Sequence, residues 1–165
     1  IRYFSKLLKK YPGSKFLLNA FGKLRKDCES LISELNLSSS VSFLDNISSW
    51  NDLQNVYKES DILLSPAVFS NGSMAIREAM ASGMGIVISR NIKIDSKLIR
   101  EKKSGFVCPL NDNDFISAVE SYITNPLLFV KHGEINKVAA SKFSVSNIAK
   151  VYSERINNIF NNNLL

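Results

Sequence analysis

A loop and the start of the helix expected after it carry the residues best suited to chemistry. The loop ends in Asn71-Gly72-Ser73, residue types that favour a helix N-cap and expose the first backbone N–H groups of the helix. A helix N-terminus of this kind carries about half a positive charge, which suits an anion such as a phosphate. A carboxylate, Glu78, lies one helical turn further along. The segment is therefore predicted to hold a phosphorylated ligand.

Two apolar runs flank this segment and position it. Ile62–Leu64 precedes the loop and Gly85–Ile88 follows the helical pattern, so the expected order is strand, loop, helix, strand. The same residues also fit a purely structural role, in which Asn71-Gly72-Ser73 only caps the helix and Glu78 is solvated. Both interpretations stay open at this point.

Apolar runs alternate with helical patterns along the whole chain. Strands are expected at Phe16–Asn19, Val41–Leu44, Asp61–Leu64, Gly85–Ile88 and Gly105–Cys108. Several are apolar at successive positions, which is typical of a parallel sheet covered on both faces. Strands that alternate with helices imply right-handed βαβ units, and such sheets bind ligands at the carboxyl ends of their strands. The predicted fold is a doubly wound parallel α/β sheet, in one domain over residues 1–165.

The last helix is expected to begin after Ser144, which is predicted to be its cap. An apolar stripe at helical spacing is predicted to face inward; its members are Val145, Ile148, Tyr152, Ile156 and Phe160.

The net charge of +6 at pH 7 and the hydrophobic content of 45% describe a basic globular protein. Solvated helix faces account for most of the basic groups, and nucleotide phosphates or an acidic membrane surface are alternative partners. Nucleic acid is not expected, because aromatic residues do not interleave with the basic groups. The longest apolar stretches are too short to span a bilayer.

Cys28 and Cys108 lie far apart in different elements, which predicts free thiols, as in a cytosolic protein. No second cysteine or nearby histidine completes a metal-ligand spacing, so no metal site is expected. The single histidine, His132, lies in a polar helical stretch and is predicted to be a surface residue.

Several short motifs follow one another in a recognisable order. The strongest is Glu78-Ala79-Met80-Ala81-Ser82-Gly83; Tyr11-Pro12-Gly13 precedes it, and Ser104-Gly105-Phe106-Val107-Cys108-Pro109 and Lys142-Phe143-Ser144 follow. Together they resemble the C-terminal, donor-binding domain of retaining nucleotide-sugar glycosyltransferases that have two Rossmann-like domains, the GT-B architecture of the glycosyl transferases group 1 family. The resemblance runs nearly the whole length of the chain.

This resemblance implies a role for each matching residue. Glu78 is expected to bind the ribose hydroxyls of a nucleotide. The residues expected to face the diphosphate or the donor sugar are Gly72 and the backbone N–H groups of Ser73, Met74 and Ala75. The residues expected to meet the base are Leu44, Asp45 and Asn46. Fixed hydrogen-bond donors aimed at the leaving diphosphate lower the barrier to breaking the sugar–phosphate bond.

The chain departs from the family pattern at one acidic position. The family's first glutamate falls at Ser70, or at Asn71 if one residue is skipped, and neither side chain is acidic. In the family that carboxylate contacts donor-sugar hydroxyls, so donor choice is expected to differ. The chain begins at Ile1 rather than Met, and the family's first strand and N-terminal acceptor domain are expected to precede it.

The resemblance implies a glycosyltransferase that moves a sugar, with retention, from a nucleotide sugar to a glycan or lipid-linked acceptor in polysaccharide biosynthesis. The fragment alone is expected to be inactive, to need no cofactor or metal, and to work with its own N-terminal domain. A cytoplasmic location is predicted, with peripheral association at the cytoplasmic face of the membrane as an alternative. Two other functions stay open: a non-catalytic nucleotide-binding module and a nucleotide-sugar epimerase of the same architecture.

Overall fold

The computed structural model describes residues 1–162, without the side chains of residues 101, 102 and 162. Strands and helices alternate along it, as the sequence predicts. The strands are β1 (Phe16–Leu18), β2 (Val41–Phe43), β3 (Ile62–Ser65), β4 (Gly85–Ser89) and β5 (Phe106–Cys108). The helices are α1 (Arg2–Lys10), α2 (Arg25–Glu34), α3 (Trp50–Glu59), α4 (Met74–Ala81), α5 (Lys93–Lys102), α6 (Asp112–Thr124), α7 (Pro126–Ser141) and α8 (Val145–Asn162).

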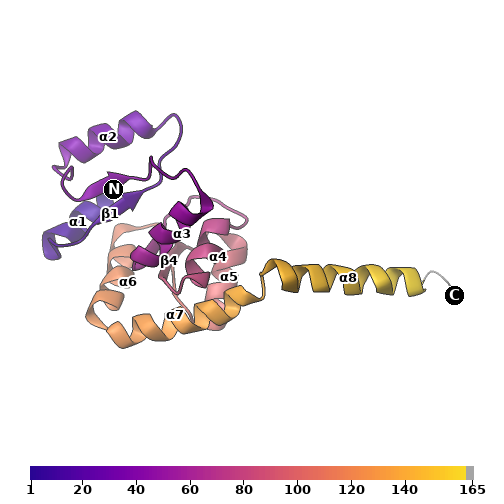
Figure 1. Cartoon of the computed structure of the whole chain (residues 1–165). Helices are drawn as coiled ribbons and strands as arrows, with labels where there is room; N and C mark the ends of the chain where they lie inside the picture. Colours follow the sequence, from indigo (N-terminus) through magenta and orange to yellow (C-terminus); the bar gives the residue numbers. More distant parts are fainter. Residues whose placement is uncertain (163–165) are drawn as a thin grey trace.

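The strands divide between two parallel sheets. β1 pairs with β2, and the second sheet has the order β3-β4-β5 (Figure 1). β4 is central in the larger sheet, and every residue of Gly85–Ser89 is buried, as its continuous apolar run predicts. The predicted parallel α/β class is therefore confirmed, with the difference that the described strands do not form one continuous sheet.

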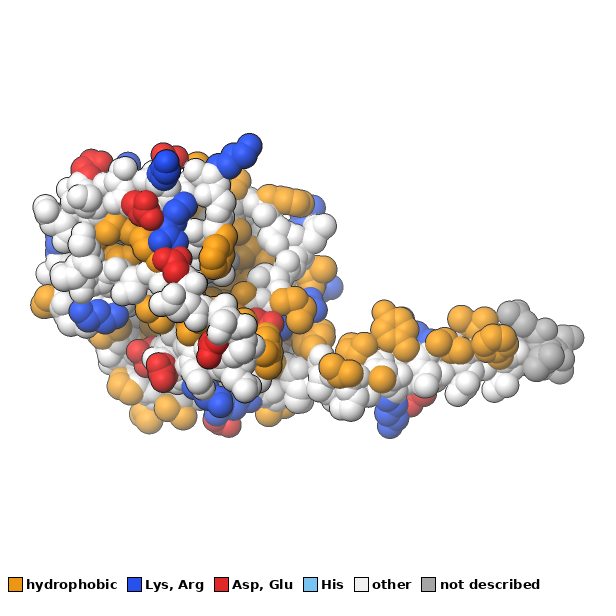
Figure 2. All heavy atoms as spheres, turned by 45° about the horizontal axis from the view of Figure 1, so that its top comes forward, with side chains coloured by type: hydrophobic (Ala, Val, Ile, Leu, Met, Phe, Trp, Pro, Cys, Tyr) orange, Lys and Arg blue, Asp and Glu red, His pale blue; other side chains and the backbone are white. Residues whose placement is uncertain are grey.

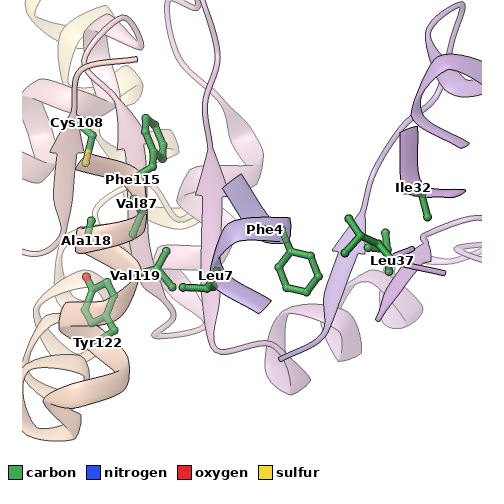
Figure 3. Close-up of a cluster of buried hydrophobic side chains, with 11 residues drawn as sticks. Phe4, Leu7, Ile32, Leu37, Val87, Cys108, Phe115, Ala118, Val119 and Tyr122 are labelled. Atoms are coloured by element: carbon green, nitrogen blue, oxygen red, sulfur yellow. The ribbon is translucent and has the colours of Figure 1, made fainter. Parts of the chain in front are cut away.

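Helix α1 joins the two sheets through an apolar cluster. Figure 3 shows Phe4 and Leu7 of α1 lying between Ile32 and Leu37 on one side and the side chains of α6 on the other. The ring of Phe4 stacks on that of Phe16 in β1, with 5.1 Å between the ring centres. Burial of such side chains stabilises a fold by about 25 cal/mol per Å² of apolar surface, so this cluster is the main connection between the sheets.

A buried polar network lies where α6 and α7 cover β4. The Tyr122 ring packs so closely on Gly85 that a Cβ atom there would lie 3.0 Å from the ring. The Tyr122 hydroxyl accepts a hydrogen bond from the Ile86 N–H (3.3 Å) and lies 2.9 Å from Nδ1 of His132. The prediction that His132 is a surface residue is wrong, because α7 turns this residue toward Tyr122 of α6, where it is buried.

Helix α8 projects from the body of the molecule (Figure 1). Hydrophobic side chains gather along one side of this helix (Figure 2). The prediction that its apolar stripe faces inward is wrong; the side chains, which are 38–87% exposed, are Val145, Ile148, Tyr152, Ile156 and Phe160. A helical period identifies an apolar face but does not say what covers it. No helix within residues 1–162 is both long and apolar enough to cross a membrane.

Both cysteines are free thiols, as predicted. Cys108, at the end of β5, is buried, and burial raises the pKa of its thiol to about 11. The thiol therefore stays protonated and unreactive at neutral pH.

The stability of the fold is expected to depend on pH through His132. Burial lowers the pKa of this imidazole below its usual 6.5, so the folded state favours the neutral ring. The contribution of the neutral His132 ring to the free energy of unfolding is fully present above pH 6.5. It is lost as the pH falls through the lowered folded-state pKa, because the unfolded chain then binds more protons than the folded one. Urea unfolding between pH 7 and pH 5 measures this loss. His132→Gln removes the titrating group, and an equal loss in that variant would contradict the assignment.

Candidate functional site

The loop after β3 and the start of α4 lie at the carboxyl end of the larger sheet, as predicted. α4 begins at Met74 with Ser73 as its N-cap residue. Asn71, Gly72, Met74 and Ala75 are exposed, so the backbone of this segment is open to a ligand. The structure corrects the predicted capping, since the Ser73 side chain makes no cap hydrogen bond.

A ladder of backbone hydrogen bonds holds the loop against the segment that leads into α5. The Ser70 N–H donates to the Asn91 carbonyl (3.3 Å), and the Lys93 N–H donates to the Ser70 carbonyl (3.0 Å). The Ile94 N–H donates to the Asn71 carbonyl (3.0 Å). The Ser70 hydroxyl also donates to the Gly72 carbonyl (3.0 Å). Ser70 is thus engaged through backbone and side chain, whereas the Asn71 side chain is exposed.

A carboxylate that the sequence analysis did not identify meets the start of α4. Oδ2 of Asp95, in the first turn of α5, accepts a hydrogen bond from the Ser73 N–H at 2.7 Å. Its Oδ1 lies 3.4 Å from Nε of Arg77. Asp95 is fully buried. Because the Ser73 N–H is already satisfied, the amides of Met74 and Ala75 are the first ones that can serve an added anion.

Glu78 is half-buried and is oriented by a residue of α3. The Tyr57 hydroxyl donates to Oε2 of Glu78 at 2.7 Å. Burial, together with this hydrogen bond and the charge of Glu78, raises the pKa of Tyr57 far above its usual value. The hydroxyl therefore stays protonated and donates at any physiological pH. The sequence placed both residues in helices but did not predict that they meet.

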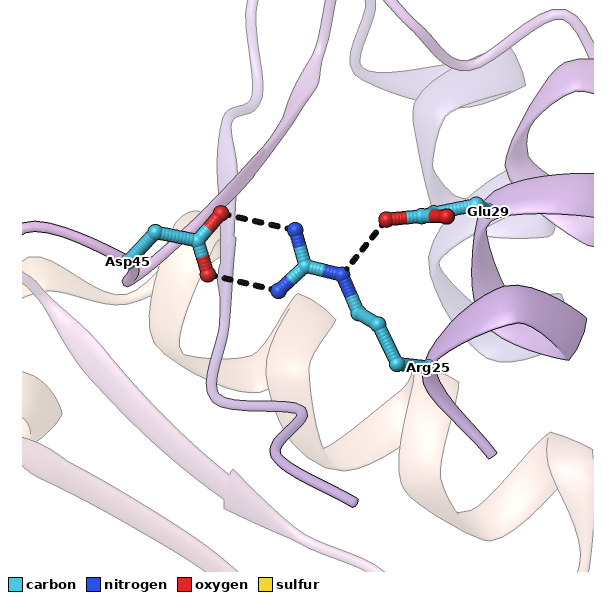
Figure 4. Close-up of polar contacts among 3 residues, drawn as sticks. All are labelled: Arg25, Glu29 and Asp45. Atoms are coloured by element: carbon cyan, nitrogen blue, oxygen red, sulfur yellow. Dashed lines mark hydrogen bonds and ion pairs between the residues drawn. The ribbon is translucent and has the colours of Figure 1, made fainter. Parts of the chain in front are cut away.

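The residues predicted to meet a base lie at the end of β2, where an arginine engages one of them. Nη1 and Nη2 of Arg25 donate to the two carboxylate oxygens of Asp45 (2.6 and 2.7 Å), and Nε donates to Glu29 (2.7 Å), as Figure 4 shows. The guanidinium carbon lies 3.5 Å from the ring centre of Phe43. These bonds raise the pKa of Arg25 and lower that of Asp45.

Leu44 and Asn46 flank this ion pair. Leu44 is half-buried and its N–H donates to the Leu18 carbonyl (3.1 Å), whereas Asn46 is exposed. The two halves of the predicted site thus follow strands of different sheets. They are linked by α3, which follows β2 and reaches Glu78 through Tyr57.

Other parts of the described chain do not offer a competing centre of chemistry. Across residues 1–162, no group of three or more His, Cys, Asp or Glu side chains is placed to hold a metal ion. One surface hollow of about 330 Å³ lies along α7, and its lining includes no residue of the loop or of α4. Its lining residues are Glu134, Ile135, Val138, Ala139 and Lys142.

Comparison with known sequences identifies one family over most of the chain. Residues 1–140 match the family described as Glycosyl transferases group 1. The UDP-Gal:alpha-D-GlcNAc-diphosphoundecaprenol alpha-1,3-galactosyltransferase of Escherichia coli is 32% identical over 111 residues, which cover 66% of this chain and 27% of that protein. An uncharacterized glycosyltransferase of Haemophilus influenzae is 24% identical over 143 residues. The match covers 86% of this chain and 40% of that relative, so the chain spans less than half the length of these curated proteins.

Comparison with solved structures shows the same fold. Sucrose-phosphate synthase from Thermosynechococcus elongatus superposes with a TM-score of 0.81 at 20% identity, covering 96% of this chain and 41% of that one. The C-terminal domain of a glycosyl transferase group 1 family protein (LpcC) from Francisella tularensis gives a TM-score of 0.73 at 19% identity. That match covers 87% of this chain and 76% of the crystallised domain.

The ion pair between Arg25 and Asp45 is expected to appear in the titration of the carboxyl group. The guanidinium holds the pKa of Asp45 below its usual 3.8, so NMR titration should place it there. Arg25→Gln should return the pKa toward 3.8, because the two hydrogen bonds and the positive charge are lost. Glu29→Gln is the control, since it leaves both bonds to Asp45 in place. An unchanged Asp45 titration in Arg25→Gln would mean that the pair does not form in solution.

Proposed function

The chain belongs to the glycosyl transferases group 1 family, and on this premise we propose that it is the donor-binding domain of a nucleotide-sugar glycosyltransferase. One observation carries the proposal. Glu78, a half-buried carboxylate of α4, accepts a hydrogen bond from Tyr57 of α3. The first amides of the same helix α4 are exposed at the carboxyl end of a parallel sheet. This places an acceptor for hydroxyl groups one helical turn from donors for an anion.

The two groups suit two parts of a nucleoside diphosphate. A carboxylate offers about four lone-pair sites, so the single bond from Tyr57 leaves Glu78 able to accept from the ribose hydroxyls. The amides of Met74 and Ala75 face the diphosphate, which the N-terminus of α4 also attracts through its dipole. Ser73 and Gly72 contribute by shaping the loop, because Asp95 already occupies the Ser73 N–H.

The base lies at the other half of the site. Leu44 and Asn46 supply backbone and side-chain groups at the end of β2, while Asp45 holds Arg25 in place over Phe43. A base therefore meets a surface that an ion pair has already ordered. Arg25 covers the Phe43 ring beside this surface, and the exposed Asn46 gives the surface hydrogen-bonding capacity.

The reaction proposed is transfer of the sugar to a glycan or lipid-linked acceptor, with retention. The amides stabilise the charge that develops on the leaving diphosphate, while the sugar gains oxocarbenium character. The acceptor sits on an N-terminal domain of the complete protein, across a cleft. The basic character of the chain, with a net charge of +6, supports peripheral contact with the cytoplasmic face of a membrane. The named acceptor of the Escherichia coli relative, a diphosphoundecaprenol-linked sugar, supports a lipid-linked acceptor, which is the kind that we propose for polysaccharide biosynthesis.

A non-catalytic nucleotide-binding module is the second candidate. The position of the family's first glutamate holds Ser70 or Asn71, and the Ser70 hydroxyl is committed to the Gly72 carbonyl. Neutral groups bind sugar hydroxyls more weakly than a carboxylate does. If transfer is retained, Asn71 is the side chain that substitutes.

Glu78→Gln is expected to weaken binding of a nucleoside diphosphate by about 1–3 kcal/mol, since a charge-assisted hydrogen bond to ribose is lost. Isothermal titration with UDP, GDP and ADP measures the change. Glu134→Gln makes the same substitution at an exposed position of α7 and should bind as the wild type does. Equal affinity in Glu78→Gln, with the fold intact, would remove Glu78 from the site.

Transfer by the complete protein is expected to depend on Asn71 more than on Ser70. Asn71→Ala should lower the rate with the preferred nucleotide sugar, and Ser70→Ala should change it little, because only the Asn71 side chain is exposed. A panel of nucleotide sugars, assayed with and without acceptor, measures this. Nucleotide binding without turnover of any donor supports the binding module, and conversion of the donor without acceptor supports an epimerase. Normal turnover in both variants shows that neither residue replaces the glutamate.

A further inference from the structure

The buried carboxylate of Asp95 lies at the start of α4, and the proposed function gives it no direct contact with the donor. Asp95 is fully buried, and removing a carboxylate from water is costly unless partners compensate for the lost hydration. Two partners are present, the Ser73 N–H at 2.7 Å and Nε of Arg77 at 3.4 Å. Both belong to α4 or its cap, whereas Asp95 belongs to α5. The chain thus places a buried carboxylate where it ties one helix to another.

The geometry of these contacts constrains α4 at two points. Ser73 is the N-cap residue and Arg77 lies one turn into the helix, so bonds to both oppose sliding of α4 along its axis and rotation about it. The N3 side chain of a capping box likewise accepts from the N-cap N–H, as Asp52 does for Ser49, but there it comes from the same helix. Here the carboxylate comes from the helix after the next strand.

The loop before α4 is held by the same cluster. A Cβ atom at Gly72 would lie 3.5 Å from Oδ2 of Asp95 and 3.6 Å from Nη2 of Arg77. The backbone ladder joins Ser70 and Asn71 to the residues just before Asp95. The clamp, defined as Asp95 with Ser73 and Arg77, therefore sets the path of the loop as well as the direction of α4.

We propose that Asp95 is a positioning residue for the donor site, which acts through the clamp to aim the Met74 and Ala75 amides and Glu78 at a nucleoside diphosphate. This inference rests on the proposed function. Glu78 follows Arg77 directly in α4, so its direction depends on the rotation of the helix. The Arg77 guanidinium offsets part of the charge of Asp95, which lies beside the proposed anion site.

Two effects of Asp95, its negative charge and its positioning of α4, predict opposite changes in nucleotide affinity when the residue is substituted. Removing a negative charge near an anion site strengthens anion binding if charge alone matters. Losing the clamp misdirects the amides and Glu78, and misplaced groups lose much of their effect. Asp95→Ala is therefore expected to weaken binding of the best of UDP, GDP and ADP by at least about tenfold. Asp95→Asn keeps an acceptor for the Ser73 N–H and should lose less, although its neutral oxygen accepts more weakly.

A matched control separates positioning from loss of stability. Ile99 is fully buried on the same helix, one turn after Asp95, and has no part in the clamp. Ile99→Ala should lower the melting temperature yet leave nucleotide affinity unchanged at temperatures where the protein is folded. Amide hydrogen exchange should accelerate at Ser73, whose N–H donates to Asp95, in Asp95→Ala beyond the level in Ile99→Ala. If Asp95→Ala does not fold, the same affinity and exchange comparison is made with Asp95→Asn, which must still bind more weakly than the wild type.

The outcomes distinguish this inference from the proposed function. If the wild type binds a nucleoside diphosphate and the Asp95 variants bind equally well, the positioning role is overturned and the proposed function stands. Tighter binding by both variants shows that Asp95 acts only as a competing charge. If the wild type binds none of UDP, GDP and ADP, the proposed function fails and the positioning role fails with it.

Discussion

Complete burial of β4 is the constraint on which the rest of the structure depends. β4 has a parallel neighbour on each side and is buried along its whole length, as is typical of a parallel sheet covered on both faces, and such sheets present their ligand-binding loops at the carboxyl ends of the strands. Close packing around it also dictates small residues. A Cβ at Gly85 would press on the Tyr122 ring, and one at Gly133 of α7 would lie 2.5 Å from the Gly83 carbonyl oxygen. The candidate site lies at the exposed carboxyl edge of this closely packed sheet.

The site is assembled from helices that follow three different strands. α4 provides the exposed amides and Glu78, α3 provides Tyr57, and α5 provides Asp95. Each contributes a hydrogen bond to a charged group, which is stronger than one between neutral groups. A ligand that binds here meets groups whose directions are already set, so little ordering is needed at the moment of binding.

The two sheets differ in how they are held. The larger one is built around a buried strand, whereas β1 and β2 reach the rest of the body mainly through the apolar side chains of α1. The arginine that orders the proposed base surface belongs to this second part, and Tyr57 lies on the helix that connects the two. The packing of residues such as Phe4 therefore sets how the proposed base surface lies relative to the loop before α4.

The sequence by itself determined the alternation of strands and helices, the loop and helix after β3, and the place of Glu78, because periodicity, capping residues and a family motif are local signals. Only the tertiary structure decided that Asp95 holds the Ser73 N–H and that Tyr57 meets Glu78. It also turned His132 into the core and left the apolar face of α8 exposed. The physical reason is the same in each instance: contacts between residues far apart in sequence depend on how helices rotate and pack, and a one-dimensional pattern identifies a face without naming its neighbour.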